Sequence, residues 1–176
     1  MSKNKTAEEL VKYFKDKFKT KIKSAEIKER AAGSKKKSTK TIWIKIDKSI
    51  FKDVIKHLVD YQFPHLAVVS GNDLDKTIEL IYHFTVNTGT RFGEINLNIS
   101  VDLPKSNPEI ETICDWIPGA LITEREKQEM LGVKVKGIPD GRKFFLDESW
   151  PDGVYPWRRD KTGPEKFYKN LHEVKK

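Results

Sequence analysis

Glycine, proline and tryptophan interrupt residues 120–160 more densely than any other part of the chain. This stretch begins with a charged run of helical character at residues 124–130. After that run, each glycine or proline interrupts a helix or a central strand, so no single regular element spans the remainder. The stretch also carries too many aromatic and apolar side chains for a disordered linker. It is therefore predicted to be an ordered, extended segment that is stabilised by lying against another surface.

The rest of the chain alternates between strand and helix patterns. Residues 41–47, for example, place Ile42, Ile44 and Ile46 on one face, as a half-buried strand does. Apolar residues spaced by three and four indicate helices instead. Helices are predicted at residues 6–19, at 48–61 and from Pro108 through Trp116, strands at 22–30, 41–47, 65–70, 77–85 and 94–103, and loops at 31–40, 71–73 and 87–93.

Neighbouring strands of hairpin type and segregated helices indicate an α+β fold. The prediction is a small, mainly antiparallel sheet with helices packed on it, followed by an extended C-terminal segment. We place the boundary after residue 132. Residues 1–132 then form the α+β domain, and residues 133–176 form an extended segment that wraps a partner.

The positive charge is concentrated at the N-terminus. Residues 1–40 hold thirteen lysines and one arginine against five acidic residues, a net charge of +9, whereas residues 41–176 have a net charge of −1. A basic arm of this kind can bind nucleic acid or an anionic membrane surface. It can also be a solvated, lysine-rich face. The abundance of lysine and glutamate is common in proteins from hyperthermophiles.

Several kinds of chemistry are disfavoured by the sequence. One cysteine, Cys114, allows neither a disulfide within the chain nor a cysteine-ligated iron–sulfur or zinc site. The four histidines do not fall at metal-pair spacing, and no phosphate-binding glycine loop follows a strand. No run of apolar residues is long enough to span a membrane. We expect a soluble chain without catalytic, cofactor-binding or metal-ligating residues of its own.

Three acidic residues, Glu124, Glu126 and Glu129, lie close together on the predicted charged helix. Paired carboxylates can perform general acid–base catalysis. They can also form salt bridges along one helix face, for instance between Arg125 and Glu129. A third interpretation is that Glu124, Arg125 and Glu126 contact charges on a partner protein, with the basic pairs at residues 142–143 and 158–159 contacting its acids.

The segment resembles the 30 kDa subunit family of respiratory complex I. The resemblance is carried by Glu124-Arg125-Glu126, Leu131-Gly132-Val133, Gly137, Pro139-Asp140, Arg142, Trp150, Gly153, Pro156 and Arg158-Arg159-Asp160. The sequence departs from the family pattern at Gln128-Glu129 and at Ile138, where the family usually has histidine. The change at residues 128–129 bears on the contacts that the helix makes with its partner. The missing histidine argues against the quinone-reducing branch. Together with the short length and the abundance of lysine and glutamate, it favours the version of the subunit found in archaeal membrane-bound [NiFe] hydrogenases.

The resemblance implies a structural subunit without a cofactor, in the peripheral arm on the cytoplasmic side of the membrane. Its expected partners are a large catalytic subunit, which carries the NiFe centre, and a small subunit, which carries the [4Fe-4S] clusters. These two subunits connect the chain to the membrane arm. An F420H2-, NADH- or ferredoxin-dependent quinone-type complex and a sulfur-reducing complex remain alternatives, as does a nucleic-acid-binding protein. The residues expected to contact the partners are Glu124, Arg125, Glu126, Gly132, Gly137, Pro139, Arg142, Lys143, Trp150, Tyr155, Trp157, Arg158 and Arg159.

Overall fold

The computed structural model describes residues 4–32, 37–89 and 93–165. Five strands form one sheet in the order β1-β2-β5-β4-β3. Strands β2 and β5 run parallel, and the other neighbouring strands run antiparallel. The predicted α+β fold with a mainly antiparallel sheet is therefore confirmed. The strands are β1 (Ile22–Ala32), β2 (Lys37–Ile46), β3 (His65–Asp73), β4 (Thr77–Val86) and β5 (Ile95–Pro104).

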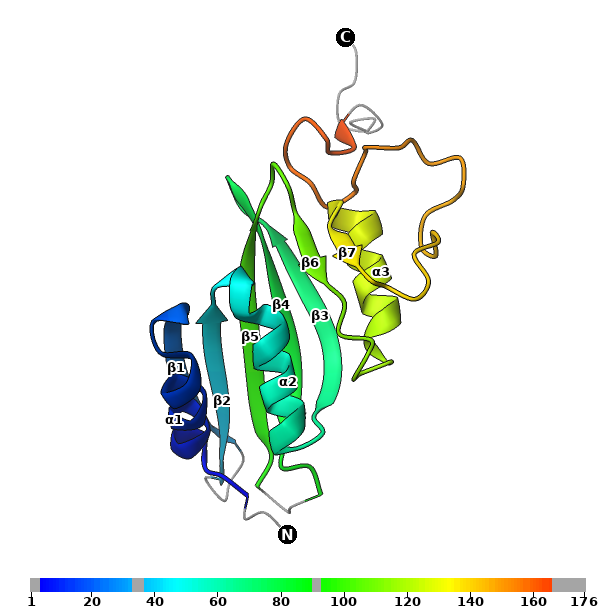
Figure 1. Ribbon diagram of the computed structural model, residues 1–176. Helices are drawn as coiled ribbons and strands as arrows, with labels where there is room; N and C mark the ends of the chain where they lie inside the picture. The colour runs from blue at the N-terminus through cyan, green and yellow to red at the C-terminus, as the bar shows by residue number, and fades with distance from the viewer. Residues whose placement is uncertain (1–3, 33–36, 90–92, 166–176) are drawn as a thin grey trace.

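Helices α1 (Ala7–Phe18) and α2 (Phe51–Tyr61) cover one face of the sheet (Figure 1). The 3-10 turns η1 (Lys19–Lys21) and η2 (Lys48–Ile50) lie next to them in the chain. A third helix, α3 (Ala120–Leu131), packs against β3. Beside it, the short strands β6 (Glu109–Glu111) and β7 (Lys134–Lys136) pair in parallel.

The core lies between the sheet and its helices. In β2, Ile42, Ile44 and Ile46 are at most 1% exposed, as their alternation predicted. The opposite face of the sheet carries polar side chains that bond across the strands. There the Lys45 ammonium pairs with the Asp102 carboxylate at 2.9 Å, which lets a polar face remain ordered without an apolar covering.

The turn predicted at residues 71–73 is wrong, because β3 continues through Asp73 in antiparallel pairing with β4. The glycine that suggested a turn has another role. A Cβ atom at Gly71 would overlap the Leu131 side chain of α3. Gly71 therefore allows α3 to approach the sheet closely, a requirement that local sequence does not reveal.

The helix predicted from Pro108 through Trp116 is also wrong. Residues 109–111 form β6, whose partner β7 lies more than twenty residues later in the chain. The Thr112 N–H extends this pairing by donating to the Lys136 carbonyl at 2.9 Å. A pairing between such distant residues outweighed a short local helical pattern.

The loop predicted at residues 31–40 is too long, because β1 reaches Ala32 and β2 begins at Lys37. Residues 33–36 lie outside the described part of the chain. The division of the chain after residue 132 stays a prediction. The β6–β7 pair joins the two sides of that boundary.

We predict that Phe14→Ala lowers the free energy of unfolding by about 3–5 kcal/mol. Phe14 belongs to the buried face of α1 and is 0% exposed, so truncation leaves a cavity in the core. Phe63→Ala is the matched control, because the Phe63 side chain is 62% exposed. Urea denaturation of both variants checks the prediction, and equal losses would contradict the described packing of α1.

Candidate partner interface

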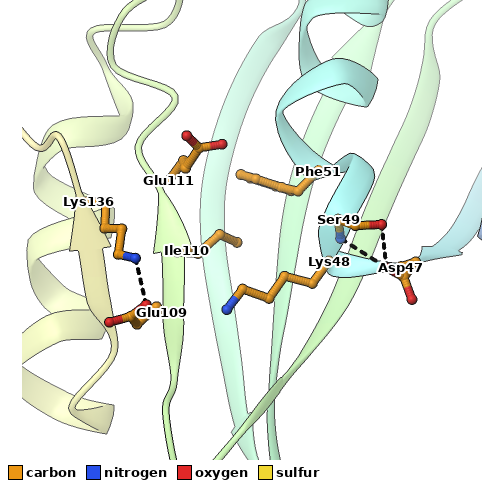
Figure 2. A pocket seen from close by; sticks show the side chains of 8 residues that line it. All are labelled: Asp47, Lys48, Ser49, Phe51, Glu109, Ile110, Glu111 and Lys136. Carbon is orange, nitrogen blue, oxygen red and sulfur yellow. Dashed lines mark hydrogen bonds and ion pairs between the residues drawn. The ribbon is translucent and has the colours of Figure 1, made fainter.

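A groove of about 520 Å³ lies between the start of α2 and strand β6 (Figure 2). Phe51 and Ile110 in its lining are each 2% exposed, so they offer little apolar surface to a ligand. The Lys136 ammonium pairs with the Glu109 carboxylate at 2.7 Å at its edge. Ligand sites usually combine an apolar lining with a few convergent polar groups. This groove offers little exposed apolar lining, so we place the candidate site elsewhere.

The candidate site consists of α3 and the residues that follow β7. We call residues 137–165 the wrapping segment. It leaves β7, loops outward from α3 and returns toward the C-terminal end of that helix (Figure 1). There the Trp157 N–H donates to the Met130 carbonyl at 3.0 Å. Because the segment is not part of a sheet, side chains must bond many of its backbone polar groups.

Two side chains of α3, one helical turn apart, bond the backbone of residues 142–146. The Arg125 guanidinium donates to the Arg142 carbonyl at 2.6 and 2.9 Å and to the Lys143 carbonyl at 3.2 Å. The Glu129 carboxylate accepts the backbone N–H groups of Phe144, Phe145 and Leu146 at 2.7–2.8 Å. We call this arrangement the backbone clamp. Arg125 is 7% exposed and Glu129 is 9% exposed, so the clamp lies inside the molecule.

Glu124 fixes the chain that leads into α3. Its carboxylate accepts hydrogen bonds from the Thr112 hydroxyl at 2.6 Å and from the Ile113 N–H at 3.0 Å. The Cys114 thiol also donates to it, at 3.4 Å. Burial raises the pKa of Glu124, and the hydrogen bonds from Thr112 and Ile113 oppose that rise. Glu124 therefore holds a loop of its own chain in place.

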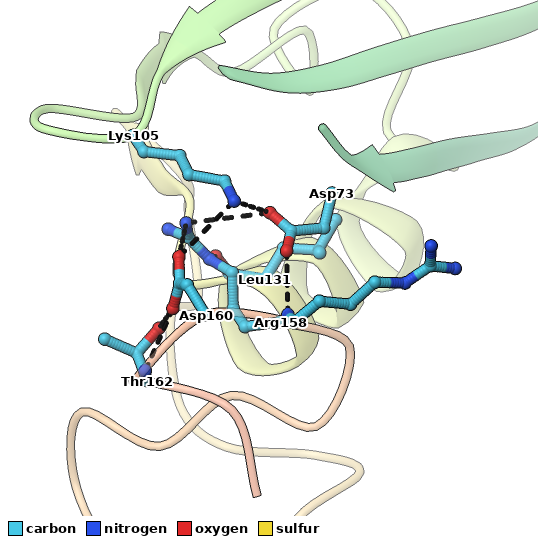
Figure 3. A network of polar contacts seen from close by, with 7 residues as sticks. Asp73, Lys105, Leu131, Arg158, Asp160 and Thr162 are labelled. Carbon is cyan, nitrogen blue, oxygen red and sulfur yellow. Dashed lines mark hydrogen bonds and ion pairs between the residues drawn. The ribbon is translucent and has the colours of Figure 1, made fainter. Parts of the chain in front are cut away.

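A network of opposite charges ties the end of the wrapping segment to the sheet (Figure 3). The Arg158 guanidinium donates to the Leu131 carbonyl at 2.7 Å and pairs with Asp160 at 3.3 Å. Lys105, at the end of β5, pairs with Asp73 at 2.6 Å and with Asp160 at 3.4 Å. Burial acts to raise the pKa of Asp160, but hydrogen bonds from Thr162 and the neighbouring cations lower it to about 2.

Aromatic side chains of the wrapping segment pack on the C-terminal half of α3. Gly132 ends the helix with a φ of +69°, and a Cβ atom there would overlap the Tyr155 ring. The Lys127 ammonium lies 4.6 Å from the centre of the Trp157 ring and pairs with Glu126. Burial lowers the pKa of Lys127. These contacts order the segment without regular secondary structure.

The structure divides the predicted interface residues into three groups. Buried ones bond within the chain, and the half-buried and exposed ones keep part or most of their surface open to solvent. Their contact with a partner stays a prediction. The buried residues are Glu124, Arg125 and Arg158, the half-buried ones are Glu126, Gly132, Trp150 and Tyr155, and the exposed ones are Gly137, Pro139, Arg142, Lys143, Trp157 and Arg159.

Sequence reasoning missed two exposed phenylalanines and two buried charges. Phe144 and Phe145 lie side by side on the wrapping segment, 58% and 44% exposed. Adjacent phenylalanines in an otherwise polar stretch were a visible signal. No local pattern indicates that the side chains of Asp73 and Lys127 are each only 2% exposed, because their surroundings come from distant parts of the chain.

The geometry does not favour acid–base or nucleophilic catalysis on α3. Both oxygens of Glu129 accept backbone N–H groups, and Glu126 pairs with Lys127. Burial raises the pKa of the Cys114 thiol to about 11, which keeps it protonated and unreactive. Within residues 4–32, 37–89 and 93–165, no group of three or more metal-ligating side chains comes together.

We predict that Glu124→Gln changes how stability depends on pH. Because the pKa of Glu124 is raised in the fold, its favourable contribution is complete below the pKa of the unfolded chain, about 4.3. That contribution is lost as the pH rises through the folded value. The free energy of unfolding of the wild type minus that of the variant should therefore fall as pH rises.

The matched variant is Thr112→Val, which removes a hydrogen bond that lowers the pKa of Glu124. In chains that carry Thr112→Val, the stability difference between chains without and with Glu124→Gln should continue to fall up to a higher pH than in the wild type. Urea denaturation between pH 4 and pH 8 measures the difference. A difference that is constant across this range would contradict a raised pKa.

We predict that Gly132→Ala costs more stability than Gly153→Ala. Both glycines have positive φ, +69° and +76°, so each alanine brings a backbone cost of about 1–2 kcal/mol. Only the new methyl group at residue 132 meets Tyr155, since the space around Gly153 is open. This overlap should add about 1–3 kcal/mol. Thermal unfolding measures both variants, and equal losses would show that Tyr155 does not pack on Gly132.

Comparison with known proteins places this arrangement in a family. The model of the family described as "Respiratory-chain NADH dehydrogenase, 30 Kd subunit" matches residues 44–166. The match therefore covers most of the sheet as well as α3 and the wrapping segment. Two solved structures share the fold at 21–22% identity. One is a protein of the archaeal membrane-bound sulfane sulfur reductase, with a TM-score of 0.62 over 93% of this chain and 86% of that one. The other is the trypsin-resistant fragment of Nqo5, with a TM-score of 0.53 over 66% of this chain and 89% of that one.

Relatives in sequence are subunits of a membrane-bound hydrogenase, an F(420)H(2) dehydrogenase and a formate hydrogenlyase. Membrane-bound hydrogenase subunit beta of Pyrococcus furiosus is 31% identical over 131 residues, which are 73% of this chain and 75% of that one. A subunit of the F(420)H(2) dehydrogenase of Methanosarcina mazei is 32% identical over 130 residues, 72% and 79% of the two proteins. Formate hydrogenlyase subunit 5 of Escherichia coli is 29% identical over 123 residues, 68% of this chain but only 21% of that much longer protein. The chain therefore belongs to the 30 kDa subunit family of the respiratory-chain NADH dehydrogenase, which includes subunits of membrane-bound hydrogenases.

Proposed function

We propose that this chain is a non-catalytic structural subunit of a membrane-bound, ion-translocating electron-transfer complex, and that it docks on the large catalytic subunit and braces it. One observation carries the proposal. Buried charged side chains of α3 hold the backbone of the wrapping segment, while Phe144 and Phe145 of that segment remain exposed. A segment fixed in this way presents a preformed surface, which lowers the entropic cost of binding a partner.

The complex we propose is a ferredoxin-dependent, hydrogen-evolving [NiFe] hydrogenase. The likeness to membrane-bound hydrogenase subunit beta and to formate hydrogenlyase subunit 5 supports this choice. In such a complex, the large subunit would hold the NiFe centre and the small subunit the [4Fe-4S] clusters. This chain would hold no cofactor and would lie in the peripheral arm on the cytoplasmic side. Among the described residues, no helix is both long and apolar enough to cross a bilayer.

A difference in length among the relatives supports docking on a large partner. The stretch similar to this chain makes up only 21% of formate hydrogenlyase subunit 5. In formate hydrogenlyase subunit 5 the similar domain is therefore joined to a long further sequence within one chain. Where the domain is a separate chain, we expect it to contact the subunit that corresponds to that further sequence. Covalent linkage replaces an association between subunits by a high effective concentration.

A second candidate is the equivalent subunit of an F420H2-dependent or a sulfur-reducing complex. The F(420)H(2) dehydrogenase relative is as similar in sequence as the hydrogenase relative, and a protein of a sulfur reductase shares the fold. The large subunit decides between these classes, because cysteine pairs that ligate nickel and iron occur only in a hydrogenase-type partner. Nucleic-acid binding by the basic residues 1–40 stays a prediction, tested by salt-dependent binding that their deletion abolishes.

We predict that the tagged chain, purified from membranes of its natural host, brings a large [NiFe]-type subunit and membrane subunits with it. Arg142→Ala and Trp150→Ala should reduce the amount of complex recovered, since both residues lie on the wrapping segment. The complex that remains should keep unchanged cluster spectra, because neither residue holds a cofactor in the proposal. Lys28→Ala, on the exposed outer strand β1, is the matched control.

Mass spectrometry identifies the co-purified proteins, and electron paramagnetic resonance measures the clusters. Purification of the wild-type chain alone, with a redox cofactor of its own, would contradict the proposal. Recovery of a large subunit without nickel-ligating cysteine pairs would instead favour the second candidate.

A further inference from the structure

The backbone clamp holds two exposed aromatic side chains at the outer surface of the wrapping segment. Phe144 is 58% exposed and Phe145 is 44% exposed, although Glu129 accepts the backbone N–H of each. Their rings lie 5.0 Å apart at an angle of 81°, so one presents an edge to the face of the other. The Arg125 guanidinium lies 5.1 Å from the centre of the Phe144 ring. We call Phe144 and Phe145 the aromatic pair.

A single exposed apolar residue is ordinary on a protein surface. The aromatic pair differs because of how its backbone is held. Arg125 and Glu129 are buried charges, and burying a charge is costly unless it is bonded. Here both charges bond the backbone of residues 142–146, which fixes that stretch while its phenylalanines remain in water. Rigid, exposed aromatic side chains are typical of residues that dominate the binding energy of an interface.

The charges around the pair indicate the kind of partner. Residues 139–153 contain two basic and four acidic residues, a net charge of −2. Two of the acids, Asp147 and Glu148, follow the pair and are exposed, whereas Asp152 pairs with Lys143 at 3.5 Å. A net negative surface is repelled by the headgroups of an anionic membrane. It complements an apolar cavity whose rim carries lysine or arginine.

We propose that Phe144 and Phe145 insert into an apolar cavity with a basic rim on the large subunit, and that this contact is the main anchor of the chain in its complex. The inference rests on the proposed function, since that function supplies the partner. Arg125 and Glu129 act as positioning residues, because they determine where the aromatic pair lies without contacting the partner.

The test uses the full-length tagged chain in its natural host. In one arm, p-benzoylphenylalanine replaces Phe144 or, as a control, Phe63, which is 62% exposed at the end of α2. After irradiation, the residue at 144 should crosslink to the large subunit, identified by mass spectrometry, and the residue at 63 should not. In a second arm, Phe144→Ser with Phe145→Ser should reduce the recovered complex about tenfold or more, whereas Phe63→Ser should not.

A third arm tests the positioning role. Glu129→Gln keeps both phenylalanines but replaces an acceptor of three N–H groups, so it should reduce the recovered complex by a smaller factor. Circular dichroism and thermal unfolding must show that each variant remains folded. If the double serine variant is destabilised, two other double variants are compared instead. Phe144→Leu with Phe145→Leu should retain most of the complex, whereas Phe144→Asn with Phe145→Asn should lose it.

The outcomes separate this inference from the proposed function. If the wild type does not co-purify with a large subunit, the proposed function fails. If the wild type does and the folded double variant does equally well, only the role of the aromatic pair is overturned. Crosslinks from residue 144 to a second copy of this chain also overturn it. The role of the aromatic pair is also overturned if the wild type floats with phosphatidylcholine–phosphatidylglycerol vesicles and the double variant does not, because the pair would then bind a membrane.

Discussion

The C-terminal part of this protein depends on the hydrogen bonds that join Arg125, as donor, and Glu129, as acceptor, to the backbone of residues 142–146. A chain outside sheets and helices must still bond its polar backbone groups. α3 supplies a donor and an acceptor one turn apart, so a single helix face bonds both carbonyl and N–H groups of the neighbouring segment. Charge-assisted hydrogen bonds of this kind are about twice as strong as neutral ones. They replace the ladder that a strand would have provided.

The same principle operates at the other end of the wrapping segment, where Arg158 bonds the last turn of α3 and Asp73 and Lys105 join it to the sheet. Removing one member of a buried pair leaves an uncompensated charge and typically costs about 3–5 kcal/mol. A shift of the segment that separated Arg158 from its partners would therefore be costly. Gly71 contributes to the same end by letting α3 approach β3.

This use of charge changes the functional interpretation of α3. The sequence suggested charged residues that contact a partner or perform acid–base chemistry. The structure places Glu124 and Arg125 inside the molecule, where they bond the chain that flanks α3 on either side. The surface left for a partner consists of exposed side chains of the wrapping segment, which include Phe144 and Phe145 and, over residues 139–153, more acidic than basic residues. That division of roles suits a family whose members are subunits of larger complexes.

The sequence by itself determined the α+β class, the buried isoleucines of β2 and the family, because each depends on local periodicity or on a motif of fixed spacing. It also indicated that the part of residues 120–160 that follows the helical run is ordered although no single regular element spans it. Only the tertiary structure decided that residues 109–111 form a strand, that Gly71 serves close packing, and that the charges of α3 point inward. These features depend on partners that are distant in the chain, and local patterns carry no information about which distant groups will meet.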